Sequence, residues 1–149
     1  MGMIKINDLF SEERIKFLDC GSREEALTEM INLSENKVID VIKFGETVFE
    51  RENIVSTGLG QGYAIPHVKN EFVPEFFITM GIIKKGVNWD SMDGKDVDVV
   101  FLIGGPDGQQ NVYLSILSKL SLVIKNSKNK EFFLNADSAK EIIDFFGKY

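Results

Sequence analysis

Apolar residues in the first third of the chain recur at intervals that predict helices. One run places its members on a single helical face: Ala26, Leu27, Met30 and Ile31. Ser22 precedes this run and Glu25 follows Ser22 by three positions, which is the spacing of a capping box at a helix start. A second helix is expected over residues 38–53, and the alternating Ile15 and Phe17 predict a short strand.

Two nearly continuous apolar runs in the second half of the chain predict buried strands. They span residues 76–83 and 97–103, and such runs are typical of strands that are covered on both faces. Helical spacing returns after residue 111, and the capping-box pair Ser138 and Glu141 predicts a last helix that ends near residue 146. Because the strands are separated by helices, we expect an α/β domain whose helices cover a buried sheet.

Size and charge narrow the class of protein. The 149 residues, 44% of them apolar, suffice for one core and contain no evident linker, so we expect a single domain over 1–149. A net charge of −6 disfavours nucleic acid as a partner. The chain lacks an apolar run of the roughly 18–20 residues that a membrane helix needs, and its first residues do not match a signal peptide. We therefore expect a cytoplasmic protein without membrane insertion.

The sequence around the only histidine, His67, favours chemistry. Pro66 fixes its own φ and offers no N–H donor, so the backbone that leads to His67 is stiff. Glycines at positions 58, 60 and 62 leave room for the close approach of a ligand or of a partner's backbone. A neutral imidazole is a good nucleophile and a good general base near neutral pH.

Other chemistries lack the residues that they require. The glycine run does not end in Gly-Lys-Ser/Thr and is followed by Pro66, so it does not match a nucleotide-binding loop. The aspartates between residues 90 and 98 do not have the spacing of an EF-hand loop, and the single cysteine, Cys20, excludes an internal disulfide and a cysteine-based zinc site. No nucleophile elbow is present. We expect neither a metal nor a cofactor.

Three segments that end at His67 resemble the enzyme IIA domains of the fructose/mannitol class of the bacterial phosphoenolpyruvate-dependent sugar phosphotransferase system, a family that includes the nitrogen-regulatory IIA proteins. These segments are residues 51–53, 56–60 and 62–67. The similarity continues through residues 87–89, 92–95, 97–102 and 114–120, and it covers roughly residues 5–147. The resemblance implies a three-layer α/β/α domain with a mixed central sheet.

The resemblance also implies a phosphotransferase component that works through a phosphohistidine. In the family, the carrier protein HPr passes a phosphoryl group to the histidine that matches His67, and an enzyme IIB takes it onward for sugar uptake. Such transfers depend on positioning and on charge stabilisation. Candidate contacts to the phosphoryl group are Arg51, Thr57 and Tyr113. Candidate residues of an apolar rim that docks HPr are Tyr63, Pro66 and Val68.

A structural interpretation stays open for each candidate contact. Arg51 suits a helix C-terminus in solvent, Thr57 suits a hydrogen bond within its loop, and Tyr113 suits a half-buried position in the core. Tyr113 also occupies the position at which sugar-transporting members usually carry a second histidine, and Val68 follows His67 where a small residue is usual. The missing second histidine supports an alternative: a nitrogen-regulatory IIA-like module whose binding to a regulatory target protein is switched by phosphorylation of His67.

Overall fold

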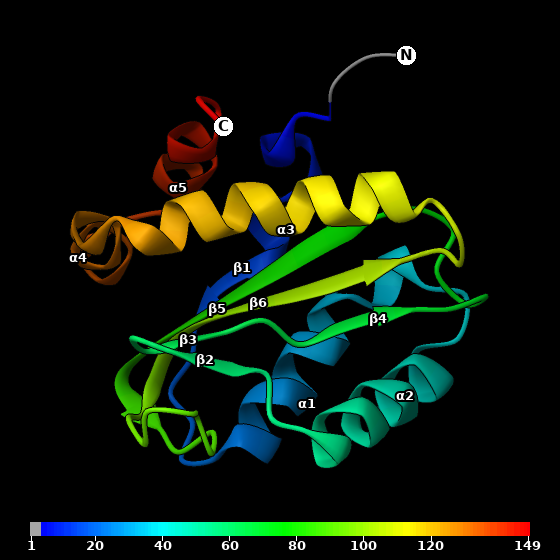
Figure 1. Cartoon of the computed structure of the whole chain (residues 1–149), viewed down its shortest axis with the longest axis horizontal. Helices are drawn as coiled ribbons and strands as arrows, with labels where there is room; N and C mark the ends of the chain where they lie inside the picture. Colours follow the sequence, from blue (N-terminus) through cyan, green and yellow to red (C-terminus); the bar gives the residue numbers. More distant parts are fainter. Residues whose placement is uncertain (1–3) are drawn as a thin grey trace.

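A mixed β-sheet runs through the middle of the molecule and is covered by helices on both faces (Figure 1). The computed structural model describes residues 4–149, so the first residues, in which we expect no signal peptide, lie partly outside the described range. The strands are β1 (Ile15–Phe17), β2 (Gly58–Gly60), β3 (Tyr63–Ala64), β4 (His67–Lys69), β5 (Phe77–Val87) and β6 (Val97–Gly105).

The order of the strands places His67 beside the central strand β6. The sheet runs β1-β5-β6-β3-β2, and β4 pairs with β6 next to β3. β5 and β6 are antiparallel, as are β2 and β3, whereas β1 is parallel to β5 and both β3 and β4 are parallel to β6. Ala64 is opposite Val100 and His67 is opposite Ile103, so β3 and β4 form one interrupted line along β6. Pro66, which has no backbone N–H, lies at the interruption.

In the described part of the chain, two helices cover one face of the sheet and three lie on the other, as can be followed in Figure 1. The first layer consists of α1 (Arg23–Leu33) and α2 (Val41–Ile54), and the second of α3 (Gln110–Lys125), α4 (Ser127–Asn135) and α5 (Ala139–Phe146). Short 3₁₀ turns occupy Ile6–Leu9, Glu12–Arg14 and Glu35–Lys37. The predicted three-layer α/β/α architecture with a mixed sheet is confirmed.

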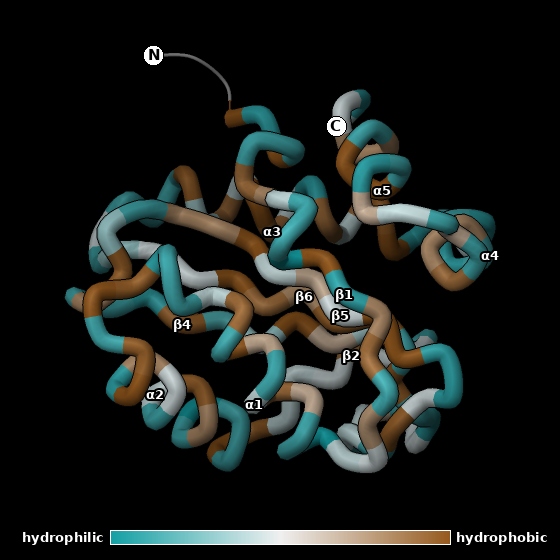
Figure 2. The backbone as a smooth tube through the Cα atoms, turned by 180° about the vertical axis from the view of Figure 1, so that it is seen from behind, coloured by the Kyte–Doolittle hydropathy of each residue, from teal (hydrophilic) through white to brown (hydrophobic). Residues whose placement is uncertain are grey.

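A hydrophobic core lies on each side of the sheet. Towards α3, α4 and α5 the core is rich in phenylalanine: Phe10 stacks on Phe146 at a centroid distance of 4.4 Å, and Phe101 meets Phe146 edge-on at 6.1 Å. Towards α1 and α2, Phe44 and Trp89 are completely buried. Figure 2 shows hydrophobic stretches in the central strands and an alternation of hydrophilic and hydrophobic residues along the helices. Burial of these apolar faces joins the three layers.

The predicted caps fix two helix starts. The Ser22 hydroxyl accepts a hydrogen bond from the Glu25 backbone N–H at 3.1 Å, although the Glu25 carboxylate accepts from Gly21 rather than from Ser22. At α5 both halves of the capping box formed by Ser138 and Glu141 are present. Local side-chain chemistry therefore sets these boundaries.

Three elements differ from the sequence prediction. The helix expected over residues 38–53 begins later, because the Asp40 side chain caps its first turn. Helix α4 was not expected; the Asn126 side chain caps it directly after α3 ends. Strand β4 was not expected either, and it forms because His67 and the two residues after it pair with β6. Long-range pairing decides such a short strand, since its three residues contain no periodic signal.

Candidate phosphoryl-transfer site

The backbone holds one nitrogen of the His67 ring. Nδ1 lies 2.8 Å from the carbonyl oxygen of Ile65. A carbonyl oxygen only accepts hydrogen bonds, so this contact assigns the proton to Nδ1 and leaves a lone pair on Nε2. The intervening Pro66 is rigid, and its carbonyl accepts from the Ile103 N–H at 2.9 Å, which keeps the two groups in this relation. The ring is half-buried and presents a single nucleophilic nitrogen.

The surroundings of His67 favour the neutral imidazole. Burial is the main cause that lowers its pKa from the usual 6.5, and the positive charge of Arg51 acts in the same direction. The hydrogen bond to Ile65 and the charge of Glu52 oppose this shift. The net direction is downwards, so the ring is neutral and nucleophilic at neutral pH.

Arg51 lies in the last turn of α2, which agrees with the structural interpretation of this residue, and its charge acts on the site as well. Its Nη1 donates to the carbonyl oxygen of Val55 at 3.1 Å, which stabilises the C-terminal end of the helix. Its charge also acts to lower the pKa of His67, and it opposes the effect of burial on the pKa of Tyr113. The guanidinium is therefore an electrostatic neighbour of both rings. Within residues 4–149 it forms no ion pair with a carboxylate. A cation without an anionic partner is suited to phosphate oxygens.

Tyr113 lies beside the His67 ring. The ring centroids are 5.7 Å apart and the planes are inclined by 49°. Tyr113 also stacks on Phe76 and is only 8% exposed, so its ring belongs to the core while its edge borders the site. Burial raises the pKa of its hydroxyl, which keeps the group a neutral hydrogen-bond donor at neutral pH.

Comparison with known proteins places the chain in a family. Residues 8–149 match the family model of the phosphoenolpyruvate-dependent sugar phosphotransferase system, EIIA 2. The chain belongs to this family. It is therefore a IIA domain, a phosphotransferase component with a phosphocarrier role in a sugar phosphotransferase system.

The curated relatives of this IIA domain include sugar-specific proteins. The chain is 32% identical over 149 residues to the PTS system fructose-specific EIIABC component of Bacillus subtilis (strain 168), and it spans 24% of the length of that protein. It is 31% identical over 144 residues to the mannitol-specific phosphotransferase enzyme IIA component of Halalkalibacterium halodurans, of which it covers 95%.

Solved structures share the fold of the IIA domain. The nitrogen regulatory protein IIA-Ntr from Neisseria meningitidis superposes with a TM-score of 0.89 at 27% identity, over 95% of this chain and 98% of that one. IIA mannitol from Escherichia coli superposes with a TM-score of 0.79 at 16% identity, over 92% of this chain and 98% of that one. The mixed sheet and its two helical layers are thus shared with these two proteins.

The three side chains predicted to form an apolar docking rim are buried, so the prediction of an exposed rim is wrong. Tyr63 is 1% exposed and Val68 is 5% exposed, and Pro66 is buried as well. Because β3 and β4 both pair with β6, their side chains point into the two cores: Tyr63 stacks on Phe101 at a centroid distance of 6.2 Å, and Val68 lies in the core under α1 and α2. These three side chains therefore offer little surface to a partner.

Thr57 is bound to Glu52 in the interior of the IIA domain. Its hydroxyl donates to the Glu52 carboxylate at 2.6 Å, its backbone N–H donates to the same carboxylate at 2.7 Å, and Trp89 Nε1 donates to the hydroxyl at 3.4 Å. The hydroxyl proton of Thr57 is therefore occupied in this arrangement, which agrees with the structural interpretation of Thr57 as a loop residue.

Glu52 is the residue of this region that sequence reasoning missed. It is 2% exposed and follows Phe44 and Val48 at intervals of four along the buried side of α2. A buried carboxylate requires hydrogen-bond donors. A glutamate at an apolar position of the helical spacing therefore indicates, in the sequence alone, a residue with specific hydrogen-bond partners. The Glu52–Thr57 contact attaches the end of α2, where Arg51 lies, to the segment that leads to β2.

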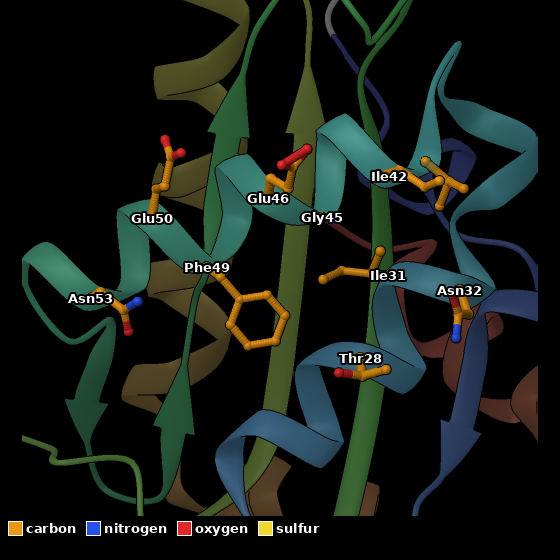
Figure 3. A pocket seen from close by; sticks show the side chains of 10 residues that line it. Thr28, Ile31, Asn32, Ile42, Gly45, Glu46, Phe49, Glu50 and Asn53 are labelled. Carbon is orange, nitrogen blue, oxygen red and sulfur yellow. The ribbon is translucent and has the colours of Figure 1, made fainter.

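A separate groove lies between α1 and α2 (Figure 3). It has a volume of about 500 Å³, and neither His67 nor Arg51 lines it. Gly45 lies where the two helices approach, and a Cβ there would meet Ile31 at 3.2 Å.

Within residues 4–149, no group of three or more His, Cys, Asp or Glu side chains is arranged to hold a metal, and none of the helices is long and apolar enough to cross a membrane.

Proposed function

We propose that His67 accepts a phosphoryl group from phospho-HPr on Nε2 and passes it to an enzyme IIB. The observation that carries this proposal is the hydrogen bond between Nδ1 and the Ile65 carbonyl, because it leaves the Nε2 lone pair as the free nucleophile of the only histidine. The lowered pKa of His67 supports it, since the neutral ring is the reactive form.

The transfer exchanges one P–N bond for another. The Nε2 lone pair forms a bond to phosphorus while the bond between phosphorus and the donor histidine breaks, and the electron pair of that bond returns to the donor ring. The proton on Nδ1 stays in place, held by Ile65. Arg51 provides positive charge where the oxygens of the transferred group are negative. In the onward step the nucleophile of the IIB attacks the same phosphorus, and the pair of the P–N bond returns to Nε2.

A IIB as the next acceptor fits what is recorded for a structural neighbour. The Escherichia coli enzyme IIA for mannitol is described in complex with its phosphorylated enzyme IIB, and its fold matches the chain with a TM-score of 0.81 at 14% identity. For the present chain the fructose- and mannitol-specific relatives suggest a sugar or sugar alcohol of that class. We place this exchange in the cytoplasm, which agrees with a single cysteine that is buried and unpaired.

Mass spectrometry of the phosphorylated chain tests the proposal. The chain is incubated with phosphoenolpyruvate, enzyme I and HPr, with an established IIA protein labelled in parallel. We expect the wild type to gain one acid-labile phosphoryl group, which His67→Ala does not gain. Labelling that persists in His67→Ala, or no labelling of the wild type while the parallel protein is labelled, would contradict the assignment.

Two observations favour a second candidate function, in which phosphorylation of His67 controls binding to a regulatory protein. Tyr113 occupies the position of the usual second histidine, and IIA-Ntr from Neisseria meningitidis is a structural match at 27% identity. Phosphorylated chain mixed with purified fructose- and mannitol-class IIB proteins separates the two. Rapid loss of the label to a IIB supports sugar relay, whereas a stable label that alters capture of a target protein supports regulation.

A further inference from the structure

Lys69 shares the active-site face of β4 with His67. Side chains alternate along a strand, so His67 and Lys69 project to one side of the sheet, and Val68 between them projects into the core under α1 and α2. Both side chains meet the same neighbour from α3. The Tyr113 ring lies 5.7 Å from the His67 ring, and the Lys69 ammonium lies 4.9 Å from the centre of the Tyr113 ring.

The partners of the Lys69 ammonium are all neutral. Nζ donates to the side-chain oxygen of Gln110 at 2.6 Å and to the backbone carbonyl of Gly108 at 3.4 Å, and it lies over the Tyr113 ring. In the part of the chain that the structure describes, Lys69 forms no ion pair with a carboxylate. Its positive charge is therefore not balanced by an ion pair among these residues. A phosphoryl oxygen is a stronger acceptor for an ammonium than a neutral amide oxygen is.

We propose that Lys69 is a second cation of the phosphoryl site and that it leaves Gln110 and Gly108 to pair with the group carried by Nε2 of His67. The inference rests on the proposed function of His67. It assigns a source of positive charge to a site in which Tyr113 is neutral. Arg51 reaches the group from the end of α2, and Lys69 reaches it from β4, so the two cations come from different elements.

The role of Lys69 is electrostatic and involves no proton transfer. The ammonium donates N–H to phosphoryl oxygens while the P–N bond to His67 forms, and its proton count is unchanged. Because the pairing exists only when the group is present, it stabilises the transition state and the phosphorylated form relative to the free chain. The flexible stem of a lysine allows this movement from Gln110.

Chemical phosphorylation with potassium phosphoramidate tests Lys69 without any partner protein. Since His67 is the only histidine, intact mass reports its labelling directly. We expect Lys69→Met to be labelled about ten-fold more slowly than the wild type, and Lys69→Arg to remain within about three-fold, as for the loss or retention of one charge-assisted hydrogen bond. The matched control is Lys84→Met, which removes a lysine that also lies over an aromatic ring, that of Phe17.

Phosphorus NMR of the labelled protein supplies a readout that a merely structural role would not change. A neighbouring ammonium favours the dianionic phosphoryl group, so we expect its titration in Lys69→Met to move to higher pH, and in Lys69→Arg and Lys84→Met to coincide with the wild type. Lys69→Gln, which can still hydrogen-bond Gln110, provides a second variant without charge, and amide NMR spectra verify the fold of each.

The outcomes separate the inference from the proposed function. Wild-type rates and an unchanged phosphorus titration in Lys69→Met and Lys69→Gln would overturn the role of Lys69, while labelling of His67 by phospho-HPr would still stand. Equal losses in Lys69→Met and Lys84→Met would overturn it too, because the effect would then come from net charge. If phospho-HPr fails to label the wild type, the proposed function falls, and the phosphoramidate result still decides whether Lys69 pairs with the group.

Discussion

Nδ1 of His67 lies 2.8 Å from the carbonyl oxygen of Ile65, two residues earlier in the chain. Pro66 separates the two residues, so a rigid ring fixes the distance between donor and acceptor. This contact selects the tautomer that is protonated on Nδ1.

The tautomer is accessible to direct measurement. Long-range ¹H–¹⁵N NMR spectra of the single histidine at neutral pH should show Nδ1 protonated and Nε2 unprotonated, because the Ile65 carbonyl only accepts. The opposite pattern, with the proton on Nε2, would remove the physical basis for Nε2 as the acceptor of the phosphoryl group.

The pKa of His67 predicts how labelling and stability depend on pH. Burial lowers this pKa below 6.5, so the midpoint at which the labelling rate declines with falling pH should lie below 6.5. The unfolded chain binds the proton more readily than the folded chain, so the free energy of unfolding should fall as the pH drops from 6.5 through the lower folded pKa. NMR titration of the ring measures the pKa, and urea unfolding of the wild type and of His67→Asn measures the pH dependence of the free energy of unfolding. A titration midpoint of the ring above pH 6.5 contradicts the prediction.

Replacement of Arg51 should affect transfer far more than stability. In Arg51→Met the rate of labelling should fall about 10²-fold, as for removal of one preorganised charge-stabilising donor. The hydrogen bond from Arg51 to Val55 is exposed, so the free energy of unfolding should fall by about 1 kcal/mol or less. Lys43→Met removes a charge from the first turn of the same helix and is expected to leave the rate unchanged. A rate in Arg51→Met equal to that of the control would exclude Arg51 from the site.

Glu52 should contribute to both stability and the titration of His67. In Glu52→Ala the backbone N–H and the hydroxyl of Thr57 lose their buried acceptor, so we expect a loss of about 3 kcal/mol in urea unfolding. In Glu52→Gln, which keeps the shape but removes the charge, the pKa of His67 should fall further, since the carboxylate raises it. The exposed neighbour Glu50 gives the matched controls, Glu50→Ala and Glu50→Gln; equal effects at both positions would contradict this role.

The sequence by itself determined the elements whose signals are local. Ser22 and Ser138 cap helices that the spacing of apolar residues predicts, and the two long apolar runs became β5 and β6 because both faces of these strands are covered. The motif that ends at His67 identified the family, since three separate segments had to agree.

Contacts between distant segments decided the rest. Tyr63, Pro66 and Val68 look like an accessible rim in sequence, but pairing of β3 and β4 with β6 buries all three, because a strand between other elements has neither face free. The same pairing sends His67 and Lys69 to the face where Tyr113 of α3 meets both, although Tyr113 lies far along the chain. Spacing fixes which residues share a side of one element, whereas only the register between elements fixes what each side meets.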